Sequence, residues 1–305
     1  MGDVGAPVPL TGRYAVQGAS VRAGIEAWAR RPGAQLVLLD DGSDPGRAAA
    51  LHADLCDRGC HFVLGPYGSD STRAVAEARA GAVVWNHGAA ADDVQRLPGA
   101  VSVPSPASRY LVALARAVSG LRPAARVAVL AAPGRFAQLA LDGFARAAST
   151  AGVRHVPDPG EADAVLVCGP LVWEVERLRP LIGAGKLLGG VSPGLAGFPE
   201  LLGADPEGLL APVQWHPDLP VQPELGPAAV ELEDYVAAQA YAACLIAERC
   251  LALDPDDPLA AARSLRTSTF FGPFELGADG LQVGHRLSVV RWRAGRRELL
   301  LPEAA

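Results

Sequence analysis

The stretch FVLGPYGSDSTRAVAEA, residues 62–78, decides the fold, because an apolar run leads through a polar loop into a helical pattern. The run FVLG is apolar at every position, which is typical of a parallel strand covered by helices on both faces. Ser69, Asp70 and Thr72 favour a helix start, where free N–H groups suit a carboxylate or another polar acceptor. Simple helix capping explains these residues equally well. Asp70 disfavours a strongly anionic ligand unless its side chain faces solvent.

The same alternation of apolar runs and helical patterns extends to both sides of this stretch. Strands are predicted at residues 4–8, 35–40, 62–65, 82–85, 100–103, 126–131, 164–168, 187–191 and 208–213. Helices are predicted at residues 17–30, 44–58, 71–80, 92–97, 109–121, 136–151 and 173–182. Two successive cycles of this kind predict an α/β protein with two doubly wound parallel-sheet lobes.

The last part of the sequence departs from this alternation of strands and helices. It predicts helices at residues 235–253 and 258–265, then strands at 287–292 and 298–301 around an Ala294-Gly295 turn. A late helix followed by a strand pair indicates that the chain returns to complete both lobes, through about three hinge crossovers. We expect lobe 1 to comprise residues 1–107 plus 232–285, and lobe 2 to comprise residues 108–231 plus 286–305.

Composition narrows the classes of function. A chain of 305 residues, 50% hydrophobic and 20% charged, has the profile of a soluble protein of two domains. A net charge of −6 without a basic cluster disfavours nucleic acid as a partner. The apolar helix at 235–253 contains Gln239, Glu248 and Arg249, so we expect a core helix and no direct membrane insertion. No signal peptide is visible, which fits either a removed leader or a cytosolic protein.

Motifs for catalysis, cofactors and metals are missing from the sequence. It contains no G-x-S-x-G, P-loop, H-E-x-x-H or post-strand G-x-G-x-x-G pattern. The five cysteines form no repeated C-x-x-C pair and indicate neither a zinc site nor a disulfide framework. We therefore expect no enzyme activity, no cofactor and no metal. A remote alternative is a hydrolase that uses His87 with Asp92 or Asp93.

The loops that follow predicted strands hold the candidate binding residues, since open parallel sheets bind ligands beyond the carboxyl ends of their strands. His87 is followed by small residues, Gly88 to Ala91, which let a ligand approach the backbone. Aromatic residues near strand or helix ends fit an apolar pocket for a small molecule, although each fits core packing equally well. They are Tyr14, Tyr67, Phe136, Trp173, Trp215 and Tyr235.

Six stretches resemble the branched-chain amino-acid-binding proteins that serve ABC transporters. They are VPLTGRYAVQGASVRAGIEAW (8–28), LLDDGSDPGRAAALHADL (38–55), FVLGPYGSDSTRAVAEA (62–78), RVAVLAAPGRFAQLALDGF (126–144), EGLLAPV (207–213) and FFGPFELGADGLQVGHRLSVVRW (270–292). The resemblance implies a type I periplasmic-binding fold that closes by hinge motion on a small organic ligand in the interlobe cleft. It also implies an ABC-transporter permease as partner and an extracellular, periplasmic or lipid-anchored location.

Matched motif to motif, the family's pocket serine falls on Ser69, and its small-residue loop falls on Gly88, Ala89 and Ala90. Its first-loop contact falls on Gln17, and its second-lobe aromatic falls on Phe136. The paired cysteines of some members fall on Ser43 and Gly68, so that disulfide is missing. With Pro170 after a later strand, the candidate ligand-binding residues are Gln17, Tyr67, Gly68, Ser69, His87, Gly88, Ala89, Ala90, Phe136, Pro170, Ser192, Trp215 and Tyr235.

Two departures from the family pattern bear on the ligand. Ala90 replaces a threonine that holds both carboxylate and ammonium, and the position of a glutamate for the ammonium falls on Val191, beside Ser192. Burying an ammonium without an acidic partner is costly, so we expect a ligand that is not a simple α-amino acid. The alternative function is a cytosolic sensor or regulatory domain of the same fold, which would act on a signalling partner.

Overall fold

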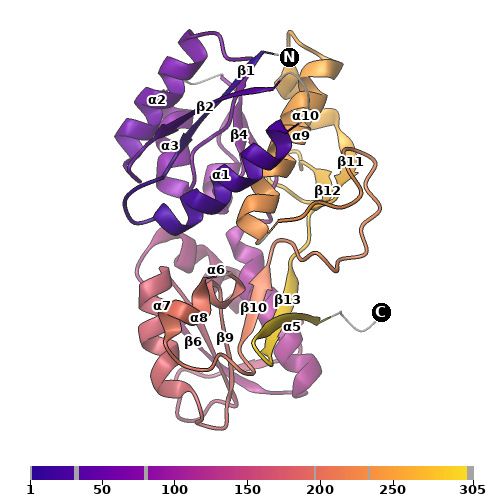
Figure 1. Cartoon of the computed structure of the whole chain (residues 1–305). Coiled ribbons are helices and arrows are strands. Elements are labelled where there is room, and N and C mark those ends of the chain that lie inside the picture. The colour runs from indigo at the N-terminus through magenta and orange to yellow at the C-terminus, as the bar shows by residue number, and fades with distance from the viewer. Residues whose placement is uncertain (1, 31–33, 79–81, 196, 233, 301–305) are drawn as a thin grey trace. The chain divides into compact units, whose positions relative to one another are not determined.

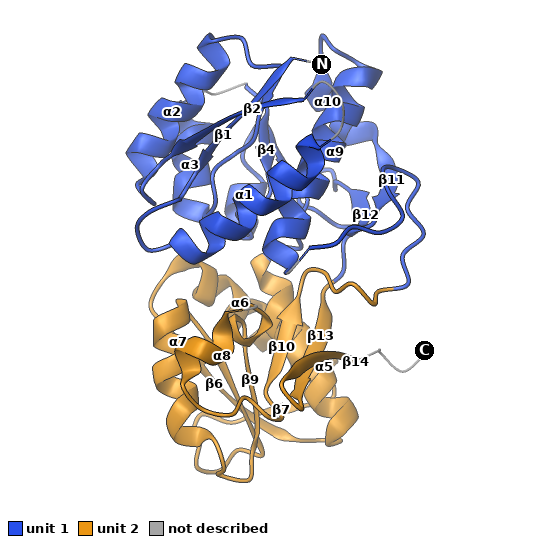
Figure 2. Cartoon of the chain, viewed as in Figure 1, with its two compact units in different colours: residues 1–106, 220–286 blue, residues 107–219, 287–305 orange. Residues whose placement is uncertain are grey.

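The computed structural model describes residues 2–30, 34–78, 82–195, 197–232 and 234–300, and the chain divides into two compact units (Figure 2). Unit 1 comprises residues 1–106 and 220–286, and unit 2 comprises residues 107–219 and 287–305. Residues 220–231, which we had expected in lobe 2, belong to unit 1. The reason is a pair of 3.0 Å hydrogen bonds from the backbone N–H groups of Glu224 and Leu225 to the Ser268 carbonyl.

Unit 1 is built on parallel strands covered by helices. Its first half contains β1 (Asp3–Val8), α1 (Ala15–Ala29), β2 (Gln35–Asp40), α2 (Pro45–Asp57), β3 (Phe62–Val63), α3 (Ser69–Ala78), β4 (Val84–Asn86), α4 (Asp92–Gln95) and β5 (Ala100–Ser102). The parallel sheet β2-β1-β3 and the parallel pair β4-β5 are joined by a bridge between Leu64 and Trp85. Helices α2 and α3 pack together, as do α1 and the late helix α9 (Figure 1). The strands thus have the order 2-1-3-4-5 of a doubly wound sheet.

The late segment of unit 1 adds α9 (Tyr235–Leu253), α10 (Pro258–Ser264) and the antiparallel pair β11 (Arg266–Thr269) and β12 (Gly272–Glu275). Helix α9 is long and apolar enough to span a membrane, but 72% of its most apolar window is buried inside the protein. The prediction of a core helix is therefore consistent with its packing.

Unit 2 contains a seven-stranded sheet of mostly parallel strands. Its elements are η1 (Ala107–Arg109), α5 (Tyr110–Leu121), β6 (Arg126–Ala131), α6 (Arg135–Ala147), β7 (Arg154–His155), β8 (Ala164–Cys168), α7 (Leu171–Leu178), η2 (Arg179–Leu181), β9 (Leu187–Gly190), η3 (Ser192–Gly194), α8 (Phe198–Leu202), β10 (Leu210–Val213), β13 (Ser288–Arg293) and β14 (Arg296–Leu300). The order is β14-β13-β10-β9-β8-β6-β7, and only the pairs that involve β13 are antiparallel. The expected turn at Ala294 and Gly295 joins β13 to β14, and both residues have positive φ.

Three helix starts show how the sequence sets the element boundaries. The Asp44 carboxylate accepts from the Arg47 N–H at 2.7 Å, with proline at the first position of α2. Asp257 caps α10 in the same way. The Asp234 carboxylate accepts from the first N–H groups of α9 and from the Ser20 hydroxyl of α1 at 2.9 Å. The last cap therefore fixes α9 against α1 as well as starting it.

Two strand features were missed by the sequence analysis. The hairpin β11-β12 begins with Arg266–Thr269, a polar and half-exposed strand without an apolar pattern. Strand β7 has only two residues, Arg154–His155, and both are exposed. Strand prediction depends on buried apolar side chains, and neither segment supplies them.

Helices α1 and α9 approach closely at one glycine. A β-carbon on Gly24 would lie 2.1 Å from the carbonyl oxygen of Ala237. Trp28, one turn later on α1, is fully buried and its ring meets Phe62 edge to face at 5.6 Å between centroids. The late helix can complete unit 1 only because residue 24 has no side chain.

We expect Gly24→Ala to lower the free energy of unfolding by about 1–3 kcal/mol, because the added methyl group has to displace backbone of α9. Gly46→Ala in α2 is the matched control, since its β-carbon would have a neighbour no closer than 3.4 Å, the Asp44 carboxylate. The control should change stability by less than about 1 kcal/mol. Urea unfolding of the two variants measures the difference. If the two variants were equally stable, α1 and α9 would be able to move apart without a loss of stability.

Candidate functional site

In unit 1 the loops after β3 and β4 lie side by side. Tyr67 and Gly88 form a parallel bridge, and the Gly68 N–H donates to the Gly88 carbonyl at 3.3 Å. One step back, the Gly65 N–H donates to the Trp85 carbonyl at 2.9 Å. A β-carbon on Gly88 would lie 2.8 Å from the Tyr67 Cα, so only glycine fits. The polar loop and the small-residue loop predicted from the sequence therefore meet, and we call residues 66–71 and 86–91 the unit 1 loops.

The buried side chain of Asn86 organises the second of these loops. Its Oδ1 accepts from the N–H groups of Gly88 at 3.1 Å and Ala89 at 2.8 Å. Its Nδ2 donates to the Ala89 carbonyl and to the Ser102 hydroxyl, both at 2.8 Å. These four bonds use both donors and both acceptor positions of the amide. The loop conformation is thus set by one side chain.

Hydrogen-bond donors remain free where the unit 1 loops meet. The Ser69 hydroxyl oxygen accepts from the Ala91 N–H at 3.3 Å, which leaves its own hydrogen available. The Ala90 N–H has no partner in the described part of the chain. The first N–H groups of α3, which starts at Ser69, also lack acceptors within the helix. Such a set of donors suits a carboxylate or another polar acceptor.

Aromatic and charged groups line the same loops. The rings of Tyr14 and Tyr67 meet edge to face at 5.4 Å, and a β-carbon on Gly68, whose φ is +98°, would touch the Tyr14 ring at 3.0 Å. The Arg13 guanidinium lies 4.7 Å from the Tyr14 ring centroid and 3.1 Å from the Asp70 carboxylate. The Asp70 side chain is 65% exposed and paired, so it presents little obstacle to an anion.

In unit 2 the loops after β8 and β9 are joined by Glu174, which lies on α7. Its carboxylate accepts from the Gly169 N–H at 2.9 Å and from the Ser192 N–H at 2.7 Å. The side chain is fully buried, and burial raises the pKa of Glu174 to about 8, although the N–H donors of Ser192 and Gly169 offset part of that rise. Glu174 thereby ties Ser192 to the loop that contains Pro170.

A second cluster in unit 2 surrounds Phe136, at the start of α6. Its ring meets that of Tyr110 edge to face at 5.2 Å, and the Tyr110 hydroxyl accepts from the Gln214 side-chain amide at 2.6 Å. Burial raises the pKa of Tyr110 well above its usual value, so the phenol stays neutral. Trp215, the residue after Gln214, is also buried. Phe136 and the segment that contains Trp215 are therefore connected through Tyr110.

The sequence profile of a family described as periplasmic binding protein matches residues 3–164, more than half of the chain. The chain belongs to the periplasmic binding protein family. Members of this family are periplasmic or extracellular solute-binding proteins that are generally not enzymes, so membership supports a binding role. Comparison with curated protein sequences found no match.

Solved structures show that the fold is that of type I periplasmic binding proteins. The substrate-binding protein LivJ of Streptococcus pneumoniae, in complex with isoleucine, has a TM-score of 0.81 and 15% identity over 98% of this chain and 99% of its own. A leucine-binding protein of Thermotoga maritima has a TM-score of 0.77 and 17% identity, over 99% of this chain and 98% of its own. A Rhodopseudomonas palustris solute-binding protein in complex with 4-hydroxybenzoate has a TM-score of 0.75 and 19% identity, over 97% of this chain and 94% of its own.

Three predicted residues of this periplasmic binding protein lie apart from the contacts above. Gln17 is a buried residue of α1, and no hydrogen bond in the described part of unit 1 joins its side chain to the unit 1 loops. Tyr235 is the first residue of α9 and is also buried. His87 follows β4 within the second loop, yet its side chain is fully buried. These three positions stay predictions as ligand contacts.

His87 has the environment of a buried neutral side chain rather than of a catalytic base. Neither ring nitrogen has a hydrogen-bond partner in the described part of the chain. Burial lowers the pKa of His87 to about 4, and the Gly65 backbone offsets this only in part. Asp93 pairs instead with Arg73 at 2.8 Å. His87 therefore lacks, among the described residues, the oriented carboxylate partner on which the hydrolase alternative depends.

The residues that shape these loops were not among the predicted site residues. Asn86 had a usable signal, since an Asn directly after a strand and before small residues often bonds to nearby backbone. Glu174 had none, because it accepts from backbone N–H groups of two loops that come together only on folding. Tyr110 and Gln214 had none either, because they bond to each other across 104 residues. Tyr14 was noted as aromatic but was left out of the candidate set.

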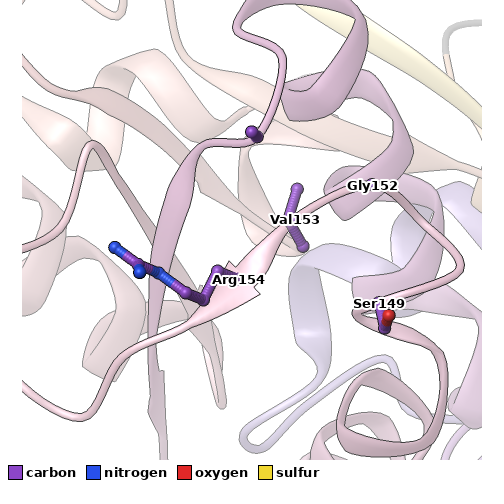
Figure 3. A pocket seen from close by; sticks show the side chains of 5 residues that line it. Ser149, Gly152, Val153 and Arg154 are labelled. Carbon is purple, nitrogen blue, oxygen red and sulfur yellow. The ribbon is translucent and has the colours of Figure 1, made fainter.

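A pocket of about 410 Å³ lies elsewhere in unit 2 and is lined by Ala124, Ser149, Gly152, Val153 and Arg154 (Figure 3). It lies where β7 begins, at the amino end of the sheet, whereas ligands of such sheets bind at the carboxyl ends. In Figure 3 the Arg154 guanidinium points away from Ser149. The lining thus offers no convergent polar groups, and we do not assign the site there.

We expect Asn86→Asp to lower the free energy of unfolding by about 2–4 kcal/mol and to speed amide exchange at Ala89. The carboxylate would keep both acceptors and could accept from the Ser102 hydroxyl, but it has no hydrogen to donate to the Ala89 carbonyl and would repel that oxygen. Ser102→Ala removes only one of these bonds and should cost about 1 kcal/mol. Denaturant unfolding with amide exchange measures both effects. If the two variants were equally stable, Asn86 would not organise the loop.

The pKa of His87 predicts a loss of stability in acid. The unfolded histidine takes up a proton as the pH falls below about 6.5, while the folded one stays neutral until about 4, so unfolding becomes easier across that window. The full loss is about 3 kcal/mol. His87→Phe should remove this component, whereas the same change at the exposed His61 should not. The difference between the unfolding free energies at pH 7.0 and pH 4.5 measures this loss in each protein. An equal difference in the unmodified chain and both variants would contradict a buried neutral imidazole at His87.

Proposed function

We propose that the chain is the substrate-binding component of an ABC-type uptake system and binds a small organic carboxylate that lacks an α-ammonium group. The observation that carries the proposal is the convergence of free donors at the unit 1 loops, namely the Ser69 hydroxyl, the Ala90 N–H and the start of α3. Donors of this kind hold a carboxylate without a positively charged side chain. The ligand would be bound and released without chemistry.

The body of the ligand would be apolar or aromatic. Tyr67, with Tyr14 against it, borders the same loops in unit 1, and Phe136 in unit 2 presents a half-buried ring. We propose that the ligand contacts both units in the cleft expected from the sequence and favours closure through the added contacts with unit 2. Such a site combines an apolar body with a few placed polar groups.

An α-amino acid is disfavoured because the acceptors for an ammonium are lacking. Ala90 has no hydroxyl, Val191 has no charge, and both oxygens of the nearby Glu174 accept backbone N–H groups. Among the similar structures, one holds isoleucine and another holds 4-hydroxybenzoate. Both ligands carry a carboxylate, so the free donors suit either one, and it is the lack of ammonium acceptors that supports the second class of ligand for this chain. The location would be periplasmic or extracellular, and the partner an ABC-transporter permease.

Titration calorimetry with benzoate, 4-hydroxybenzoate, short-chain acids, their amides, leucine and isoleucine tests the proposal. We expect an acid without an amino group to bind most tightly. Ser69→Ala should weaken that binding at least about tenfold, since a hydrogen bond to a charged group contributes about 1.5–3 kcal/mol. Ser69→Thr, which keeps the hydroxyl, should retain most of the affinity.

Ser264→Ala is the control, because that hydroxyl donates to the Ala261 carbonyl within its own helix of unit 1. It should leave binding unchanged. Tighter binding of leucine than of every non-amino compound would overturn the proposed ligand class. Binding of none of these compounds would overturn the carboxylate site.

A further inference from the structure

The turn that follows β9 in unit 2, Ser192–Gly194, is held from three elements. Its first N–H donates to the Glu174 carboxylate of α7 at 2.7 Å. The Pro193 carbonyl accepts from the indole N–H of Trp292 on β13 at 2.8 Å, and the last carbonyl of the turn accepts from the Arg297 guanidinium on β14. Contacts from a helix and two strands fix the turn at the carboxyl end of β9.

Glu174 also fixes the neighbouring loop. The other oxygen of its carboxylate accepts from the Gly169 N–H at 2.9 Å, directly after β8. Helix α7 begins after Pro170, which has no N–H to offer, so the carboxylate bonds to the residue before it. One buried side chain therefore connects the loops after two adjacent strands, β8 and β9.

Protein atoms surround the Glu174 side chain closely. This side chain has no exposed surface. A β-carbon on Gly190 would lie 2.8 Å from the carboxylate oxygen Oε2, so the backbone of β9 presses directly on the carboxyl group. The carboxyl group acts on the two loops from inside the protein and does not face solvent or a ligand.

We infer that Glu174 is a positioning residue, which holds the Gly169 and Ser192 backbone in the geometry that unit 2 presents to the ligand. The role at the ligand rests on the proposed function. The hold on the two loops is a property of the free protein and can be measured without any ligand.

Because the carboxyl group of Glu174 can gain or lose a proton, the stability of the two loops depends on pH. Facing Glu174 are the Cys168 thiol of β8, whose pKa burial raises so that it stays neutral, and the N–H groups of the two loops. Arg297 bonds to the far side of the turn, and no cation of the described chain is among the main influences on the pKa of Glu174. That pKa is about 8 in the closed loops, against an ordinary value of 4.5.

The direction of this pH dependence follows from whether the closed or the opened loops bind the proton. Between pH 4.5 and about 8 the closed loops keep the proton, whereas opened loops, with Glu174 in water, release it. Opening therefore becomes easier as the pH rises through this window. A side chain with a purely steric role would give no such slope.

Amide exchange by NMR on the ligand-free chain tests the inference. After correction for intrinsic rates, protection of Ser192 and Gly169 should fall at least about tenfold between pH 5.5 and pH 7.5. Glu174→Gln should flatten this profile, because the amide does not titrate. It should also speed exchange of the two amides about tenfold, since the amide nitrogen of Gln cannot accept a hydrogen bond, whereas both oxygens of the neutral carboxyl group can.

Glu176→Gln is the matched control, since Glu176 is exposed on the same helix beside Arg177. It should leave the profile of the two amides unchanged. A flat profile in the unmodified chain would overturn the inference even if Glu174→Gln failed to fold. A ligand screen in which nothing binds would overturn the proposed function and leave this result standing.

Discussion

Backbone polar groups in the loops that follow parallel strands leave the sheet's hydrogen-bond ladder, and each one that is buried needs another partner. The loops of both units meet this constraint with a single buried side chain. In unit 1 the Asn86 amide pairs with two N–H groups and a carbonyl of the following loop. In unit 2 the Glu174 carboxylate pairs with two N–H groups from separate loops. The conformation of these loops therefore depends on these two side chains.

The loops around Asn86 and around Glu174 both require a glycine. Gly88 lies so close to Tyr67 that a β-carbon would meet its Cα, and Gly190 lies equally close to the Glu174 carboxylate. Where backbones approach in this way, side chains are excluded and the polar groups of the loops are mainly peptide N–H groups and small hydroxyls. The scarcity of charged side chains at the unit 1 loops is thus a consequence of packing.

Sequence reasoning succeeds where burial leaves a periodic pattern. AVLVC becomes β8 with the predicted ends, and every residue in it is buried, as in a parallel strand covered on both faces. QLVLLD becomes β2 with the predicted ends, although its apolar residues are only half-buried at the edge of the sheet. The strand RTST of β11 has no such pattern, since its stability comes from pairing with β12. The candidate loops were placed correctly after their strands, as topology requires. Asn86 and Glu174 were not singled out, because their partners are backbone groups that come together only on folding.

Glu174 also bears on the chemistry of the ligand, because it brings a carboxylate beside Ser192, close to the position where the family resemblance places an ammonium acceptor. Its oxygens are fully buried and already accept N–H groups at 2.7 and 2.9 Å. Because the carboxyl group has no exposed surface, an ammonium could reach it only if the loops that contain Gly169 and Ser192 moved, and each buried N–H left unpaired costs about 1–3 kcal/mol. Burial further favours the neutral carboxyl, which attracts a cation weakly. We therefore assign the acid to the architecture of the loops and not to the ligand site that we propose.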